Sequence, residues 1–139
     1  MSEPMDFSKV RHGSGPLKDS GERREFQTGA IRDRGAMKGA FHLPPTYGLL
    51  AAALQMERGA GKYEARNWEK GMPLSEFYNS AMRHLVKLIA GYQDEPHLDA
   101  AIWNLLCLAE TRERIRRGIL PQNLNDIPTT YESHGEPQF

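Results

Sequence analysis

The sequence predicts an all-α fold, a small helical bundle with flexible N- and C-terminal arms, completed by oligomerisation. Three segments in the middle of the chain carry apolar residues at steps of three and four, the spacing of a buried helix face. Alternating patterns typical of β-strands are scarce. Residues 1–30 and 119–139 are polar and contain few large apolar side chains. We therefore expect a flexible arm at 1–30, a helical domain at 31–118 and a proline-containing tail at 119–139.

Each of the three segments has recognisable ends. Residues 44–59 begin with two prolines, which a first helical turn tolerates. Residues 73–91 are the most clearly amphipathic. Residues 94–118 begin with Asp94 as the predicted N-cap and end in a basic turn that suits the negative end of the helix dipole. All three segments stop at a glycine: Gly59, Gly91 and Gly118.

The third helix is apolar on two sides. Trp103, Leu106 and Cys107 project from one side of it. The other face is predicted to hold Leu98, Ala101, Ile102, Leu105, Leu108 and Ala109. A helix of this kind lies either in the centre of a bundle or against a second subunit. Three helices offer too little core to hide both faces, so we expect a homo-oligomer.

Composition limits the class of protein. The chain has 139 residues, enough for one domain, with 18 basic and 18 acidic residues and zero formal net charge. This balance argues against general nucleic-acid binding and against a membrane surface. Cys107 is the only cysteine, and neither a signal peptide nor a membrane span is apparent. We expect a soluble cytoplasmic protein.

Two histidines and an asparagine fall at the margin of the predicted core. At about 100° per residue, His84 shares a stripe with Phe77, and His97 shares one with Asn104. These side chains can line one cleft between the second and third helices. Each can equally be a core-edge residue whose hydrogen bonds are satisfied. His97 in a first helical turn is disfavoured as a cation by the helix dipole, which favours a neutral imidazole.

Carboxylates near the start of the third helix are candidate metal ligands. Asp94 and Glu95 offer oxygen donors that suit Mg²⁺ bridging phosphates, and Glu69 is a further donor. Surface carboxylates at a helix start are also commonly just caps, so both interpretations remain open.

The connector KYEARNWEKG (residues 62–71) is unusually aromatic and basic for a turn. Its cations can neutralise phosphate, Asn67 can pair with a base edge, and a ring can stack on a base. Lys38 lies upstream between glycines, which would allow close approach to a phosphate chain. Alternatively, the rings seal the end of the bundle and the charges are solvated. The connector candidates are Lys62, Tyr63, Arg66, Asn67, Trp68 and Lys70.

Several motifs together resemble the dATP/dGTP diphosphohydrolase N-terminal domain, a small phage-encoded family. They are TGAIRD, KG at 38–39, LPP, GAGKYEARNWEKG, SAMRHL and DEPHLDAAIWNLL, within residues 20–110. The resemblance implies a phage origin, the cytoplasm of a bacterial host, and a role in purine deoxynucleotide metabolism. The family's motif positions here are Lys62, Tyr63, Arg66, Asn67, Trp68, Glu69, Arg83, His84, Asp94, His97 and Asn104.

The activity named for such proteins is removal of pyrophosphate from dATP or dGTP. It links them to MazG-like all-α nucleotide pyrophosphohydrolases, which hold magnesium with an ExxE on one helix and an ExxD on another. This sequence departs from that pattern. Glu57 is the only acid of its first helix, and Arg83 and His84 stand where the second helix would need acids. The resemblance therefore implies nucleotide binding more directly than hydrolysis.

Three functions follow from these observations. The first is a Mg²⁺-dependent enzyme in which Arg83, Arg66 and Lys62 stabilise phosphate charge and His84 or His97 handles the water. The second is a protein that sequesters a nucleotide without cleaving it, including a cyclic nucleotide signal of host anti-phage defence. The third is a regulatory protein that docks on another phage protein and has no nucleotide affinity.

Overall fold

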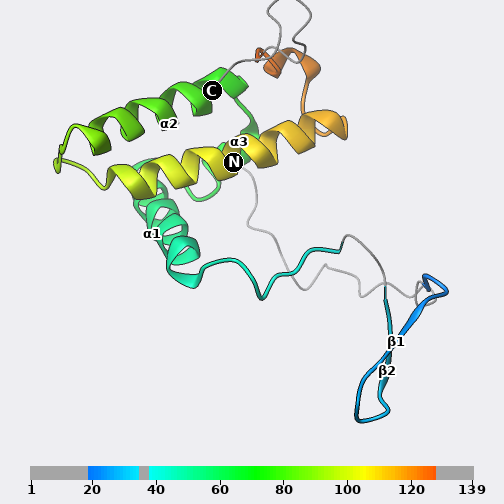
Figure 1. The fold of residues 1–139 in the computed structure, drawn as a ribbon. Coiled ribbons are helices and arrows are strands. Elements are labelled where there is room, and N and C mark those ends of the chain that lie inside the picture. Colours follow the sequence, from blue (N-terminus) through cyan, green and yellow to red (C-terminus); the bar gives the residue numbers. More distant parts are fainter. Residues whose placement is uncertain (1–18, 35–37, 128–139) are drawn as a thin grey trace, which may run out of the picture. The chain divides into compact units, whose positions relative to one another are not determined.

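The computed structural model describes residues 19–34 and 38–127 of the chain. The chain divides into two compact units, residues 1–42 and residues 43–139. The second unit holds all three α-helices and confirms the predicted all-α class (Figure 1). None of the helices in the described part of the chain is both long enough and apolar enough to cross a membrane.

The first unit contains a short β-hairpin that the sequence analysis did not predict. Strand β1 (Arg23–Glu25) pairs antiparallel with strand β2 (Ile31–Asp33). Gly29 in the turn has φ +82°, a conformation that glycine adopts without strain. Each strand has three residues and is almost entirely exposed, so it lacks the alternation of apolar and polar residues that would predict it.

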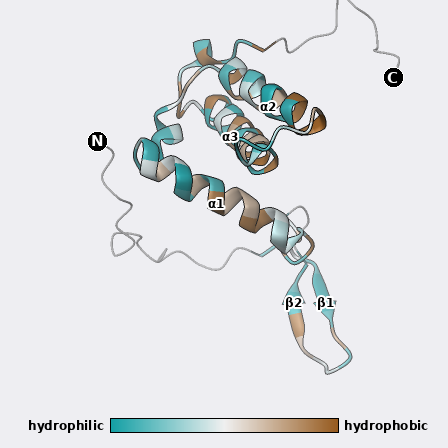
Figure 2. Cartoon of the chain, turned by 90° about the vertical axis from the view of Figure 1, so that its left-hand side faces the viewer, coloured by the Kyte–Doolittle hydropathy of each residue, from teal (hydrophilic) through white to brown (hydrophobic). Residues whose placement is uncertain are grey.

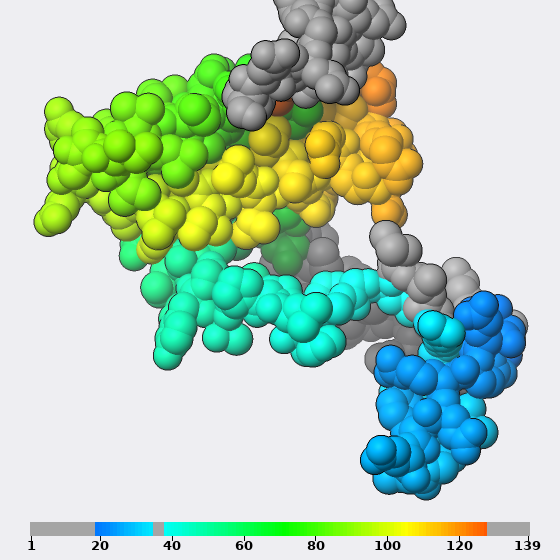
Figure 3. Space-filling view, viewed as in Figure 1, coloured from blue at the N-terminus to red at the C-terminus, as the bar shows by residue number. Residues whose placement is uncertain are grey.

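The second unit runs from α1 (Thr46–Lys62) through the 3₁₀ turn η2 (Asn67–Lys70) to α2 (Leu74–Ile89) and α3 (His97–Arg116), and closes with η3 (Gln122–Leu124). Helices α2 and α3 lie side by side in opposite directions, and their interface is the most extensive one in this unit. Helix α1 packs against α3 rather than α2. Figure 3 shows α2 and α3 as one continuous layer of atoms.

Two of the three predicted helix stops are confirmed. Gly91 and Gly118 follow α2 and α3 with φ +83° and +74°. After each glycine the next amide bonds back across the last turn, from Tyr92 to the Lys87 carbonyl and from Ile119 to the Arg114 carbonyl. The prediction for α1 is wrong, because this helix continues through Gly59 to Lys62.

Asp94 is not the N-cap of α3, contrary to the prediction. Helix α3 begins at His97, the N-cap position is Pro96, and no side chain among the described residues caps the free amides. The Asp94 carboxylate bonds instead to the His97 ring. The His97 ring follows Asp94 by three residues. Its N–H is a hydrogen-bond donor, so it can take the place of a backbone amide as the partner of the Asp94 carboxylate.

The core lies mainly between α2 and α3. Leu74, Phe77 and Ala81 of α2 are buried, and the Phe77 ring meets Trp103 edge-on with centroids 6.3 Å apart. The buried face of α3 differs from the predicted one. Leu98 and Leu105 are 49% and 47% exposed, whereas the buried residues of α3 are His97, Ala100, Ala101, Asn104, Cys107, Thr111 and Ile115. Small residues are buried because α3 contacts both other helices, and close helix crossings need short side chains.

Helix α1 contributes only Ala52 to the buried set. Leu49 and Leu50 are about half exposed, and Figure 2 shows apolar residues in the N-terminal half of this helix. An apolar helix face left in water favours association with a partner. We expect the protein to form the homo-oligomer predicted from its sequence. Size-exclusion chromatography with light scattering should give a multiple of 15.7 kDa at micromolar concentration, and a strict monomer would contradict this expectation.

Thr111 is fully buried, and its hydroxyl has no hydrogen-bond partner among the described residues. A buried hydroxyl without a partner destabilises the folded state. We expect Thr111→Val, which keeps the shape and removes the hydroxyl, to raise the free energy of unfolding by about 1 kcal/mol. Urea denaturation followed by circular dichroism measures this change. A loss of stability would show that the hydroxyl is satisfied after all.

The start of α2 is capped from a distant part of the chain. The Ser75 amide donates to the Asp126 carboxylate at 2.9 Å, and the Ser75 hydroxyl donates to the same group. These hydrogen bonds lower the pKa of Asp126 below its ordinary value of 3.8. A carboxyl whose pKa is lower in the folded state stabilises the fold above its unfolded pKa and loses this effect as pH falls. We expect Asp126→Ala to lower the melting temperature at pH 7 and to have little effect in strong acid.

Candidate functional site

His84 and His97 meet between α2 and α3. His84 lies two turns after the buried Phe77 on the same face of α2, and His97 is the first residue of α3. Their Nδ1 atoms are 2.9 Å apart, and their ring centroids are 5.2 Å apart. His97 is 2% exposed, whereas His84 is half-buried and reachable from solvent. The structure therefore brings together the two histidines that the sequence placed at the core margin.

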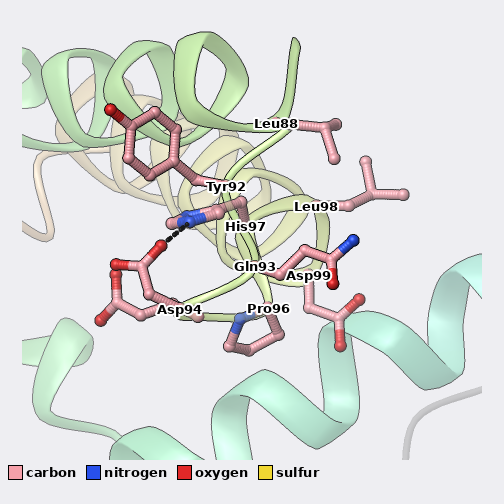
Figure 4. A pocket seen from close by; sticks show the side chains of 9 residues that line it. Leu88, Tyr92, Gln93, Asp94, Pro96, His97, Leu98 and Asp99 are labelled. Carbon is pink, nitrogen blue, oxygen red and sulfur yellow. Dashed lines mark hydrogen bonds and ion pairs between the residues drawn. The ribbon is translucent and has the colours of Figure 1, made fainter. Parts of the chain in front are cut away.

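Asp94 determines which nitrogen of His97 faces His84. Its carboxylate accepts a hydrogen bond from His97 Nε2 at 2.8 Å, drawn as a dashed line in Figure 4. A neutral His97 then carries its only proton on Nε2 and presents a lone pair at Nδ1. The bond from His97 lowers the pKa of Asp94 and keeps this carboxylate ionised. Asp94, His97 and His84 thus form one hydrogen-bonded chain.

The surroundings favour a neutral His84. Burial is the main cause that lowers the pKa of the His84 imidazole, and the neighbouring Glu95 opposes this effect. Electrostatic repulsion by His97 and Lys87 lowers this pKa further, by smaller amounts. A neutral ring next to the lone pair of His97 has two options. It can donate its own Nδ1–H to His97, or it can offer a second lone pair to a cation.

A pocket of about 440 Å³ opens beside this chain of side chains. Tyr92 and His97 both line the pocket, and Figure 4 shows their side chains together with Asp94. Asp99 on the rim binds Arg58 of α1 at 3.1 Å, so all three helices contribute to this region. The lining residues are Leu88, Tyr92, Gln93, Asp94, Glu95, Pro96, His97, Leu98 and Asp99.

Sequence analysis missed Tyr92 and Arg58 as site residues. Tyr92 is 60% exposed in the loop between α2 and α3. An aromatic residue directly after a helix-ending glycine and before DEPH was a signal that could have identified it. Arg58 carried no signal of this kind, because its partner Asp99 is 41 residues away in the chain.

The residues able to hold a metal ion differ from the predicted set. His84, Glu95 and His97 offer donor atoms that all lie within 4.8 Å of one another. Of the predicted ligands, Asp94 bonds to His97, and Glu69 pairs with Arg66 at 2.9 Å and Arg114 at 3.8 Å. Arg114 follows His97 by seventeen residues of one helix, which is about 25 Å. The structure therefore does not bring Glu69 to Asp94 and Glu95.

The connector meets α3 near the C-terminal end of that helix. Its charged side chains pair mainly with other residues of the connector. The Arg114 guanidinium lies 5.3 Å from the centre of the Trp68 ring, and Lys62 lies 5.1 Å from that of Tyr63. Lys70 pairs with Glu64, and the backbone N–H of the half-buried Asn67 donates to the Glu64 carbonyl. The connector residues therefore do not share one binding site with the two histidines. The half-buried Trp68 ring fits the interpretation that a ring seals the end of the bundle, whereas Tyr63 is 68% exposed and does not.

The other predicted residues each have surroundings of their own. Asn104 is buried about two turns further along α3, and its side-chain amide donates to the Ala100 carbonyl at 2.8 Å. Arg83 is exposed on α2 next to His84 in the chain, and its charge is among the smaller causes that lower the pKa of the His84 imidazole. Lys38 belongs to the first unit, where it pairs with Asp33 at 3.1 Å.

Comparison with known proteins gives one match. The family model described as dATP/dGTP diphosphohydrolase, N-terminal, matches residues 28–118, a segment that includes the histidine pair and the whole pocket. Neither a curated protein nor a solved structure matches the chain.

Proposed function

Because the chain belongs to the dATP/dGTP diphosphohydrolase N-terminal domain family, we propose that it hydrolyses purine deoxynucleoside triphosphates to the monophosphate and pyrophosphate. The family match carries this proposal. The pocket supports it, since the matched segment holds a cluster of histidine and carboxylate side chains open to solvent on one side.

The proposed reaction is the attack of water on the α-phosphate of the nucleotide. A water oxygen forms a bond to the α-phosphorus and releases its proton to solvent, the bond to the bridging oxygen breaks, and pyrophosphate leaves with its electron pair. The protein must hold the triphosphate, orient the water and compensate the charge that develops on the phosphates. A pocket lined by Asp94, Glu95 and Asp99 would repel a triphosphate, so a cation is required.

The donors present fit a divalent cation. His84, Glu95 and His97 would hold it, and when bound it supplies phosphate neutralisation and a more acidic water. Lys87, 3.9 Å from Asp94, lies where it can attract a phosphate. Tyr92 is exposed at the pocket and offers a ring on which a purine can stack. Asp94 holds the His97 ring in place.

The test is a nucleotide panel in ¹⁸O-labelled water. Protein stripped of metal is incubated with dATP, dGTP, dCTP and dTTP, with and without a divalent ion, and the products are separated by ion exchange. We expect purine substrates to give monophosphate and pyrophosphate in equal amounts, only with the ion present. The label should appear in the monophosphate, because attack at the α-phosphorus leaves the water oxygen there.

The same experiment can overturn the proposal. Nucleotide that binds and is recovered intact after denaturation would assign the protein to sequestration. Label in the pyrophosphate would place the attack at the β-phosphorus instead. Absence of both binding and turnover would leave neither nucleotide function standing.

A further inference from the structure

We infer that His84, Glu95 and His97 form a binding site for Zn²⁺ or a similar transition-metal ion, in preference to Mg²⁺. The inference concerns the same pocket as the proposed function and deepens it. It can be tested by metal binding alone, so the two can fail separately.

The spacing of the two imidazoles matches ligands of one ion. Two nitrogens that each lie about 2.0–2.1 Å from a zinc ion are about 2.9–3.4 Å apart, depending on the angle between them. The Nδ1 atoms of His84 and His97 are 2.9 Å apart. A carboxylate oxygen of Glu95 completes the set within 4.8 Å. A movement of the exposed Glu95 carboxylate toward the two imidazoles would place three donors around one ion.

The ring of His97 is already oriented for this role. Its Nε2–H donates to Asp94 at 2.8 Å, which leaves Nδ1 as the nitrogen with a lone pair. Metal-binding histidines commonly bond a carboxylate through their other nitrogen, because this fixes the ring and increases its basicity. Since His97 is 2% exposed, its neighbours also prevent the ring from turning away. Asp94 is thus a positioning residue and not a ligand.

The donor types select against magnesium. Mg²⁺ prefers oxygen ligands and keeps several of its waters, whereas imidazole suits zinc and the later transition metals. Two histidines and one glutamate, with the remaining coordination positions open, are the ligand set of a catalytic zinc site. Glu95 and His97 line the pocket and Glu95 is exposed, so this side of the cluster remains accessible to water and phosphate.

The experiment measures metal binding to the full chain without substrate. Metal-free protein is titrated with Zn²⁺ against a chromophoric chelator, with Co²⁺ as a visible-absorption probe, and with Mg²⁺ by calorimetry. We expect one Zn²⁺ per chain, retained in excess Mg²⁺, and a Co²⁺ spectrum typical of nitrogen ligation. Asp94→Asn should weaken Zn²⁺ binding about 10–100-fold while leaving one site per chain.

Matched variants separate this site from adventitious binding. His84→Ala and Glu95→Gln should each remove the tight Zn²⁺ site, and circular dichroism checks that they fold. Glu76→Gln, an exposed glutamate in the first turn of α2, should bind Zn²⁺ like the parent. Zn²⁺ binding that survives both His84→Ala and Glu95→Gln, or Mg²⁺ that displaces Zn²⁺, would overturn the inference. Tight Zn²⁺ binding without nucleotide turnover would instead leave it standing and reject the proposed function.

Discussion

The His84→Ala variant is expected to hydrolyse dGTP at least about 100-fold more slowly than the parent protein, because one side chain serves two purposes. His84 supplies one of the three donor groups to the proposed cation, and it faces the lone pair of the buried His97. Truncation removes both contacts. Steady-state kinetics with chromatographic detection of pyrophosphate measures the loss, which should lie mainly in kcat.

The only other histidine in the described part of the chain provides a matched control. His42 is exposed and belongs to the first unit, so His42→Ala should leave turnover unchanged. If His84→Ala retains full activity while metal is still required, the cation must sit elsewhere. If the parent is fully active after thorough removal of metal, the His84–His97 pair acts by proton transfer, with His84 Nε2 as the free basic nitrogen.

Much of the fold could be predicted from the sequence, because it depends on local signals. The apolar spacing of α2 and the glycines after α2 and α3 follow from the geometry of a single helix. The buried face of α3 could not be predicted in this way. The leucines of α3 form one possible buried face and its small residues form another. Which of the two faces is buried depends on where α1 and α2 pack against α3.

The candidate site was partly predictable for the same reason. His84 and His97 fall on stripes that also carry buried residues, so helical periodicity alone placed them between α2 and α3. The packing of the connector could not be predicted, because the Trp68 ring lies against Arg114, 46 residues later in the chain. Charges that appear available to phosphate in the sequence, such as Arg66 and Lys70, pair with acids of the same loop.

The Phe77→Ala variant is expected to lower the free energy of unfolding by about 3–5 kcal/mol. This is a large share of the total stability of a small domain. Phe77 is 1% exposed and contacts Trp103, so truncation removes buried apolar contacts and leaves a cavity between α2 and α3. Urea denaturation followed by circular dichroism, at one fixed protein concentration, measures the change.

The neighbouring Tyr78, which is half exposed, gives the matched control, and Tyr78→Ala should cost less than about 1 kcal/mol. Because Phe77 lies two helical turns from His84 on the same face of α2, we expect its contact with Trp103 to help align the two histidines. Phe77→Ala should therefore weaken Zn²⁺ binding even at temperatures where the protein remains folded. A variant that loses stability but binds Zn²⁺ like the parent would show that the loop carrying Asp94 and Glu95 holds the site without help from the core.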